Sequence, residues 1–332
     1  MQRSSPVLGL FLLADTCHSP RMKNPLISQN GTPSSSFCFG TMQFGDGADE
    51  TQSRAMYDAC RAAGINFFDT AHVYTGGRSE TLLGQCATLE RDALIIATKC
   101  GYAGGSSRDN ILTTFDESRR RLGMDFVDVL YLHRWDDNTP LEETFETLAT
   151  LQQAGKIGII GASNFAAWQV MKAQAVAEKF NTRINILQPM YNLVKRQAEV
   201  EILPMAASEG FNVAPYSPLG GGLLTGKYTA GDTGRLSNDT RYAARYGLDW
   251  MHKAAADLSA IAARESVNPA TLAVAWAAKN PAVTAPIISA RTAEQLMPSL
   301  DARTYQMTDQ LYAELAALIP TPPPATDRIE EA

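Results

Sequence analysis

Short apolar runs alternate with longer amphipathic segments along the chain from residue 37 onward. Each run spans about five to eight residues and is rich in Ile, Val and Phe, which is typical of strands buried on both faces. The eight runs cover residues 37–42, 65–70, 94–99, 127–133, 157–164, 184–188, 211–216 and 285–290. The pattern therefore predicts eight buried strands.

The segments between these runs have apolar residues at helical spacing. Five of them cover residues 51–63, 111–122, 141–154, 166–180 and 199–209. Gly64, Gly123, Gly155 and Gly210 follow four of them, where a helix commonly ends on a left-handed residue. Eight strands alternating with helices, without a break in composition, predict a single (β/α)8 barrel over residues 37–319. The main alternative is a doubly wound sheet.

Polar side chains stand at the ends of seven successive predicted strands. They are Asp69, Lys99, His133, Ser163 with Asn164, Gln188, Tyr216, and Ser289 with Arg291. In a barrel the carboxyl ends of the strands converge on one face, which holds the active sites of this architecture. We therefore expect these side chains to form one site.

Asp69, Tyr74, Lys99 and His133 form a coherent acid-base set. A Lys ammonium beside a Tyr stabilises the phenolate and lowers a pKa that is otherwise near 10. Asp69 would keep Lys99 protonated, and His133 would orient a carbonyl or relay the proton. None of these side chains can donate a hydride, so carbonyl reduction here requires an organic cofactor. Taken singly, each residue also fits a structural role, such as a turn cap or a core histidine.

Composition excludes several classes of protein. The chain has 332 residues, 45% hydrophobic and 19% charged, which is enough to build a sizeable core and excludes a disordered or collagen-like chain. Its net charge of −6, without a long basic block, gives no reason to expect a nucleic acid partner. The five cysteines form no CxxC pair, so we expect reduced thiols and a cytoplasmic location.

The first residues form an N-terminal extension, 1–36, ahead of the barrel. The apolar stretch 6–14 is far shorter than the roughly 20 residues of a membrane span. It could be the apolar part of a secretory signal, but Asp15 and the polar run after it make a poor cleavage site. We expect that translation starts at Met22 and that residues 1–21 do not belong to the biological chain. A Pro-rich tail, 320–332, follows the barrel.

Other motifs fail at a decisive position. The segment 221–227 resembles a P-loop, but Tyr228 stands where a Ser or Thr must bind Mg²⁺. The same segment fails the dinucleotide fingerprint because Thr225 replaces its third glycine. The chain has four histidines without HExxH, and it lacks GxSxG, so we predict neither a metal site nor a serine hydrolase.

The chain resembles an aldo-keto reductase, of the long-chain bacterial type related to potassium-channel β subunits. The matching stretches appear in family order across nearly the whole chain. They are 39–45, 68–74 with 78–80, 98–99, 131–133, 161–165, 188–192, 215–219 with 224–228, and 290–295. An ordered set of this kind is far more specific than any single piece of it.

The resemblance implies that Tyr74 is the general acid of an NADPH-dependent carbonyl reduction, tuned by Lys99 and Asp69, while His133 positions the carbonyl. It implies that the cofactor is bound by Gly40, Thr41, Met42, Asp69, Ser163, Asn164, Gln188, Tyr216, Ser217, Leu219, Gly221, Lys227, Arg235, Ser289, Arg291, Gln295 and Ser299. Among these, Ser163, Asn164 and Gln188 would hold the carboxamide, and Tyr216 would stack on the nicotinamide. An Arg such as Arg291 offers a charge-assisted fork to a 2′-phosphate, which favours NADPH over NADH. Ser299 stands where the family usually has Asn, and its shorter side chain weakens the expected adenine contact.

The substrate is less well defined by the sequence. We expect the pocket to be lined by Phe44, Tyr74, His133, Trp135 and Tyr191, although simple packing is a competing interpretation for Phe44, Trp135 and Tyr191. Small aldehydes, pyridoxal, sugar aldehydes and polycyclic or terpenoid ketones are all compatible with an aromatic pocket. The alternative function is a cofactor-sensing regulatory subunit with little turnover, as in the channel β subunits.

Overall fold

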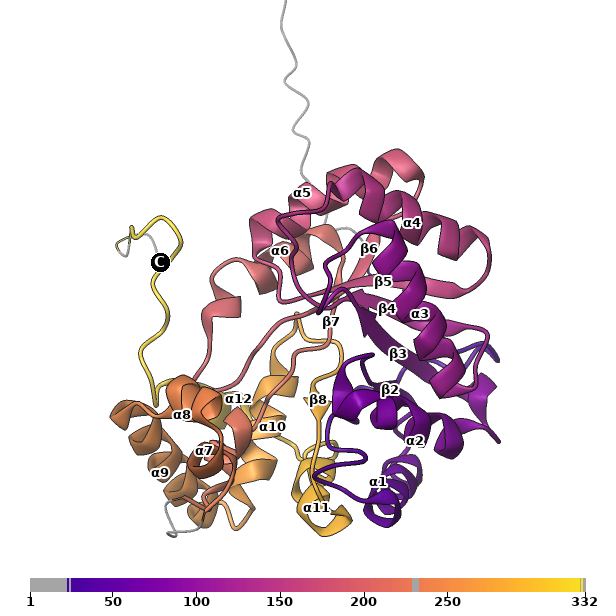
Figure 1. The fold of residues 1–332 in the computed structure, drawn as a ribbon. Coiled ribbons are helices and arrows are strands. Elements are labelled where there is room, and N and C mark those ends of the chain that lie inside the picture. Colours follow the sequence, from indigo (N-terminus) through magenta and orange to yellow (C-terminus); the bar gives the residue numbers. More distant parts are fainter. Residues whose placement is uncertain (1–22, 24, 229–232, 329, 331–332) are drawn as a thin grey trace, which may run out of the picture.

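Eight parallel strands form one sheet in the order β7-β6-β5-β4-β3-β2-β1-β8. The computed structural model describes residues 23, 25–228, 233–328 and 330, so the expectation for residues 1–21 lies outside the described residues (Figure 1). The strands are β1 Cys38–Gly40, β2 Phe67–Asp69, β3 Ile95–Cys100, β4 Val127–Leu132, β5 Ile157–Ser163, β6 Ile184–Gln188, β7 Asn212–Val213 and β8 Ile287–Ile288. Every predicted strand run overlaps one of them.

The sheet closes on itself between its first and last members. The amide of Ile287 donates to Pro215 O at 2.8 Å, and Tyr216 and Ile287 form a parallel bridge. The strands thus follow one another in sequence order around a barrel. A doubly wound sheet would instead reverse its strand order part-way along the chain. The predicted (β/α)8 barrel is confirmed.

Helices connect the strands and cover the outside of the barrel (Figure 1). The α-helices are α1 Glu50–Ala62, α2 Arg78–Ala87, α3 Arg108–Leu122, α4 Leu141–Gln153, α5 Ala167–Ala177, α6 Ile202–Glu209, α7 Arg235–Asn238, α8 Thr240–Tyr246, α9 Asp249–Arg264, α10 Pro269–Lys279, α11 Ala293–Asp301 and α12 Asp309–Ala316. The short 3-10 turns are η1 Tyr74–Gly77, η2 Arg91–Ala93, η3 Glu178–Phe180, η4 Gln197–Glu199 and η5 Gly220–Thr225. As predicted, α3 and α6 end on the left-handed glycines Gly123 and Gly210, with φ of 65° and 70°. No helix in the described ranges is long and apolar enough to cross a membrane.

Two apolar clusters give the barrel its core. One fills the barrel interior and includes Phe67, Val129 and Ile186, while the other lies between the sheet and the helices. Leu26 packs against the interior cluster, and an antiparallel bridge between Ile27 and Pro33 folds this segment back on itself. Leu26 therefore belongs to the core of the barrel, a role that the sequence pattern did not reveal.

Candidate active site

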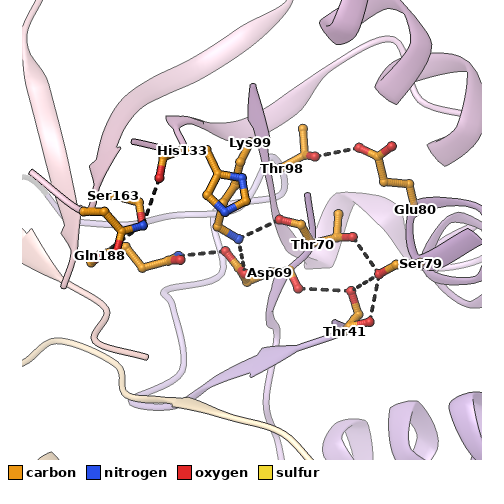
Figure 2. Close-up of polar contacts among 11 residues, drawn as sticks. Thr41, Asp69, Thr70, Ser79, Glu80, Thr98, Lys99, His133, Ser163 and Gln188 are labelled. Carbon is orange, nitrogen blue, oxygen red and sulfur yellow. Dashed lines mark hydrogen bonds and ion pairs between the residues drawn. The ribbon is translucent and has the colours of Figure 1, made fainter. Parts of the chain in front are cut away.

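An ion pair between Lys99 and Asp69 lies at the centre of the site (Figure 2). Lys99 comes from β3 and Asp69 ends β2, so two neighbouring strands bring the charges together. The Lys99 ammonium contacts the Asp69 carboxylate and donates to Thr70 O at 2.7 Å. Gln188 on β6 donates from Nε2 to Asp69 Oδ1 at 2.8 Å. The carboxylate thus has partners on both of its oxygens.

Burial and pairing act in opposite directions on this ion pair. Burial alone would lower the pKa of Lys99, but Asp69 and Tyr74 outweigh it and raise that pKa. Burial also raises the pKa of Asp69, and Lys99 and Gln188 oppose the rise. Removing either charge would leave the other buried without a counterion, which is costly. We conclude that Lys99 is an ammonium at neutral pH.

Tyr74 begins η1, five residues after Asp69 at the end of β2. Its ring centre is 5.0 Å from Lys99 Nζ. Burial raises the pKa of Tyr74, whereas Lys99 lowers it by its charge and by a hydrogen bond. Lys99 therefore acts in the predicted direction, but burial has the larger effect. The phenol stays protonated at neutral pH, as a proton donor must.

His133 follows β4 and packs between two aromatic rings. Its centroid is 5.9 Å from that of Tyr74 and 4.8 Å from that of Tyr102. Burial, together with the charges of Lys99 and Arg134, lowers the pKa of His133 to about 3. The neutral imidazole has a buried Nδ1 without a hydrogen-bond partner in the structure. This state favours a role in orienting a carbonyl over the relay of a charge.

The side chains expected at the nicotinamide lie beside this set. Ser163 Oγ donates to Gln188 O at 3.0 Å, and Asn164 Nδ2 donates to His133 O at 2.9 Å. The hydroxyl of Tyr216 donates to Asn164 Oδ1 at 2.7 Å, and burial raises the pKa of this phenol to about 12. Three strand ends thus place these groups next to the Lys99–Asp69 pair.

The segment expected at the pyrophosphate, Ser217 to Lys227, leaves the same end of the barrel. A Cβ on Gly221 would lie 2.7 Å from Tyr242 Cδ1, and Gly221 has a φ of +66°. Glycine is therefore required there, and it leaves the backbone open to close approach. Leu219 lies in this segment and is half-buried. The side chain of Arg235, the remaining residue predicted here, lies outside what the structure describes.

The residues expected at the adenosine 2′-phosphate follow β8. Ser289 is half-buried, and Arg291 and Gln295 are exposed, the latter on α11. A Cβ on Gly47 would lie 3.4 Å from Arg291 Nε, so the guanidinium passes close to the β1–α1 loop. The hydroxyl of Ser299 is buried without a partner. Burial of this hydroxyl gives the predicted adenine contact no support, and the contact stays a prediction.

The three residues predicted on the first strand loop have different surroundings. Gly40 lies within β1, where a Cβ would be 2.8 Å from Ile287 Cγ2. Thr41 is buried, and its amide donates to Asp69 O at 2.8 Å. Met42 is half-buried at the mouth of the barrel. Thr41 therefore supports the β2 strand end, and any contact it makes with a cofactor would come from its backbone.

Two of the residues predicted to line the pocket are core residues. Phe44 and Tyr191 are both 0% exposed. Phe44 packs against Phe39, and Tyr191 stacks near Trp276 while its hydroxyl donates to Glu199 at 2.6 Å. Neither presents a surface to a substrate in this structure, which favours the competing interpretation of simple packing for both.

Aromatic rings nevertheless lie beside His133 and in the loop that follows it. Trp135 is half-buried, with its ring centroid 5.3 Å from that of Phe165 and 5.7 Å from that of Trp168. Trp168 is 59% exposed, and Tyr102, beside His133, is 45% exposed. The sequence pattern missed Tyr102 and Trp168 because both lie beyond the strand ends, where no periodicity marks them.

Comparison with known proteins agrees with this geometry. A model of the Aldo/keto reductase family matches residues 36–320. The chain belongs to the aldo/keto reductase family. It is thus an oxidoreductase of a family that typically uses NAD(P)H, as its motifs predicted.

Its relatives are named for different roles. A probable voltage-gated potassium channel subunit beta from Oryza sativa subsp. japonica is 32% identical, over 91% of this chain and 98% of that protein. An uncharacterized oxidoreductase, YrpG, from Bacillus subtilis is 33% identical, over 91% of this chain and 97% of that protein. Aflatoxin B1 aldehyde reductase member 2 from Rattus norvegicus is 33% identical, over 75% of this chain and 67% of that protein.

Proposed function

We propose that this aldo/keto reductase reduces an aldehyde or ketone to an alcohol, with NADPH as cofactor and Tyr74 as the general acid. The observation that carries the proposal is the set of Tyr74, Lys99 and Asp69 beside a neutral His133. It supplies a proton donor, a cation to stabilise the phenolate and a neutral imidazole to hold a carbonyl oxygen. Bound NADPH supplies the hydride.

The residues at the strand ends fit this cofactor. Ser163, Asn164 and Gln188 present hydroxyl and amide groups suited to the nicotinamide carboxamide, and Tyr216 offers a ring to stack on. The bare backbone at Gly221 suits close approach by a pyrophosphate. Arg291 is exposed and offers two parallel hydrogen bonds to a 2′-phosphate.

Three side chains assist the transfer of the Tyr74 proton to the carbonyl oxygen. His133 donates a hydrogen bond that orients the carbonyl oxygen toward Tyr74. The Tyr74 hydroxyl gives its proton to that oxygen as negative charge develops there. Lys99 stabilises the phenolate that results, and Asp69 keeps Lys99 charged and aimed at it. The placement of Lys99 therefore matters most in the transition state.

The aromatic rings at the mouth narrow the substrate class. Tyr102 lies beside His133, and Trp135, two residues after His133, packs against the exposed ring of Trp168. Rings prefer stacked or edge-on partners, so this wall favours a carbonyl compound with a planar or bulky apolar body. Small aliphatic aldehydes would gain little binding energy from these rings.

The second candidate is a cofactor-sensing subunit with little turnover. Its support is the similarity to potassium channel subunits along almost the full length of both chains. The presence of all four acid-base residues favours the enzyme.

One experiment separates these proposals. The purified protein is titrated with NADPH and NADH, and a panel of carbonyl compounds is then tested at saturating cofactor. The reductase predicts at least a tenfold preference for NADPH together with turnover of some carbonyl. Binding with rates below roughly one per minute on every substrate would favour the sensor, since ordinary enzymes turn over at about 1 to 1000 per second. Absence of binding would contradict both.

A further inference from the structure

A fully buried carboxylate lies outside the barrel, behind the catalytic strand ends. Glu80, in the first turn of α2, is 0% exposed. A buried charge is costly unless it is paired and hydrogen-bonded. Glu80 has both kinds of partner. Thr98 Oγ1 donates to its Oε1 at 2.6 Å (Figure 2). Arg121 Nη1 donates to its Oε2 at 3.2 Å.

Thr98 connects this carboxylate to the catalytic lysine. Successive side chains of a strand point to opposite faces. Lys99 points into the barrel toward Asp69, so its neighbour Thr98 points outward to Glu80. Glu80 thus holds the outer face of β3 next to the residue that carries the ammonium.

Arg121 connects the same carboxylate to the loop that carries Tyr74. Its Nη1 donates to His72 O at 2.9 Å, two residues before Tyr74. Gly77, three residues after Tyr74, lets the guanidinium pass, because a Cβ there would lie 2.5 Å from Arg121 Nε. Glu117 holds the second amino group of Arg121 at 3.1 Å. The Glu80–Arg121 pair therefore ties the Tyr74 loop to β3.

Ser79, the residue before Glu80, forms hydrogen bonds near Asp69. Ser79 Oγ lies 2.8 Å from Thr41 Oγ1 and 2.9 Å from Thr70 Oγ1, and Thr41 Oγ1 donates to Asp69 O at 3.1 Å (Figure 2). The amide of Ser79 also donates to Thr75 Oγ1, next to Tyr74, at 2.9 Å. One turn of α2 thus contacts the neighbours of Asp69, Tyr74 and Lys99 in the chain, namely Thr70, Thr75 and Thr98.

We propose that Glu80 is a positioning residue for the reaction. From outside the barrel it fixes the relative position of Lys99 and Tyr74, through its contacts with Thr98 and Arg121. The inference rests on the proposed function, because the relative position of Lys99 and Tyr74 matters for catalysis only if they act in carbonyl reduction. Glu80 touches no reacting atom. Its effect is to fix the separation of the phenol and the ammonium, and an error of about 1 Å in such a placement can cost on the order of a hundredfold in rate.

The test compares Glu80→Gln with Asp128→Asn. Gln keeps the size of Glu80 and can accept from Thr98, but it loses the charge that holds Arg121. Asp128 is a matched control, since it is 7% exposed, pairs with Arg91 at 2.6 Å and lies near the start of β4, at the opposite end of the barrel from the site. Two readouts are used: steady-state kinetics on a carbonyl that the wild type reduces, and the Tyr74 Cζ signal in ¹³C-tyrosine-labelled protein, assigned with Tyr74→Phe.

We expect Glu80→Gln to lower kcat by on the order of tenfold to a hundredfold, with the Kd for NADPH within a few-fold. We also expect it to shift or broaden the Tyr74 signal. Asp128→Asn should lower thermal stability to a similar extent, yet leave both the kcat and the signal unchanged. If Glu80→Gln changes neither kcat nor the Tyr74 signal beyond Asp128→Asn, the inference is overturned.

Two further measurements distinguish failure of the positioning role from failure of the variant to fold and from failure of the proposed function. If Glu80→Gln fails to fold, Thr98→Val removes only the hydrogen bond to Glu80, and an unchanged kcat and Tyr74 signal in that variant would overturn the inference. If the wild type reduces no carbonyl, the reductase proposal fails. The Tyr74 signal, which needs no turnover, then decides the positioning role on its own.

Discussion

The imidazole of His133 stands edge-on to the ring of Tyr74, with the centroids 5.9 Å apart and the planes at 85°. This packing buries His133 beside a phenol and near the Lys99 ammonium, so a second positive charge is strongly disfavoured. The arrangement makes His133 a neutral hydrogen-bonding group throughout the physiological pH range, which has a consequence for stability.

We predict that His133 makes the protein lose stability as the pH falls below about 6.5. The pKa of His133 is about 3 in the folded chain and about 6.5 when unfolded, so between these values only the unfolded chain binds the proton. From about pH 6.5 to pH 5, the wild type should lose about 1.5 kcal/mol more of its free energy of unfolding than His133→Gln does. Denaturant unfolding at several pH values measures this. Parallel curves for the two proteins would show that His133 titrates normally.

Arg291→Ala should weaken NADPH binding selectively. Loss of a charge-assisted pair of hydrogen bonds to the 2′-phosphate should raise the Kd for NADPH about tenfold to a hundredfold. NADH lacks that phosphate and serves as the control, with its Kd expected within twofold. Fluorescence titration measures both constants. An equal change for the two cofactors, or no change, would remove Arg291 from the phosphate site.

Bound NADPH should protect the segment from Leu224 to Gly247 against proteolysis. It carries Arg241 and Tyr242 on α8, and Tyr242 already lies against Gly221 in the segment expected at the pyrophosphate. Limited trypsin digestion should therefore slow severalfold at the arginines of this segment when NADPH is present. Equal digestion with and without the cofactor would show that this segment does not close over bound NADPH.

Trp168→Ala should discriminate between substrate shapes. Trp168 is 59% exposed, so its loss should leave folding intact, while a bicyclic aromatic aldehyde loses a stacking partner. Its KM should rise about threefold to tenfold, and that of a short aliphatic aldehyde should stay within twofold. The exposed Trp250 on α9 provides the matched control, Trp250→Ala. A uniform effect on all substrates would mean that Trp168 does not line the pocket.

The order of the strands and the acid-base residues could be predicted because both depend on local patterns. A buried strand requires a short apolar run, and a polar residue at its end lies on the functional face of a barrel. Strand lengths were less predictable. β7 and β8 are two residues each, although the apolar runs are longer, because Pro215 and Pro286 lack the amide hydrogen that a ladder needs.

The surroundings of individual side chains could not be predicted in the same way. Tyr191 and Tyr102 are both aromatic residues near strand ends, yet one is buried against Trp276 and the other is exposed beside His133. The difference depends on which distant helix covers each residue, and a single sequence does not encode that locally. In the sequence, Glu80 likewise stood out only as part of the matching stretch 78–80, and its contacts could not be predicted. Its partners, Thr98 and Arg121, come from separate elements.

The most direct test of the proposed chemistry is a single-turnover experiment with wild type and Tyr74→Phe. Each protein is loaded with NADPH, mixed with an aromatic aldehyde, and followed by the loss of reduced nicotinamide absorbance. We predict that the wild type oxidises the bound cofactor rapidly. Tyr74→Phe should bind NADPH within a few-fold of the wild-type affinity yet abolish reduction, because the hydroxyl acts in the transition state. Wild-type rates in Tyr74→Phe would contradict the assignment of Tyr74 as the general acid.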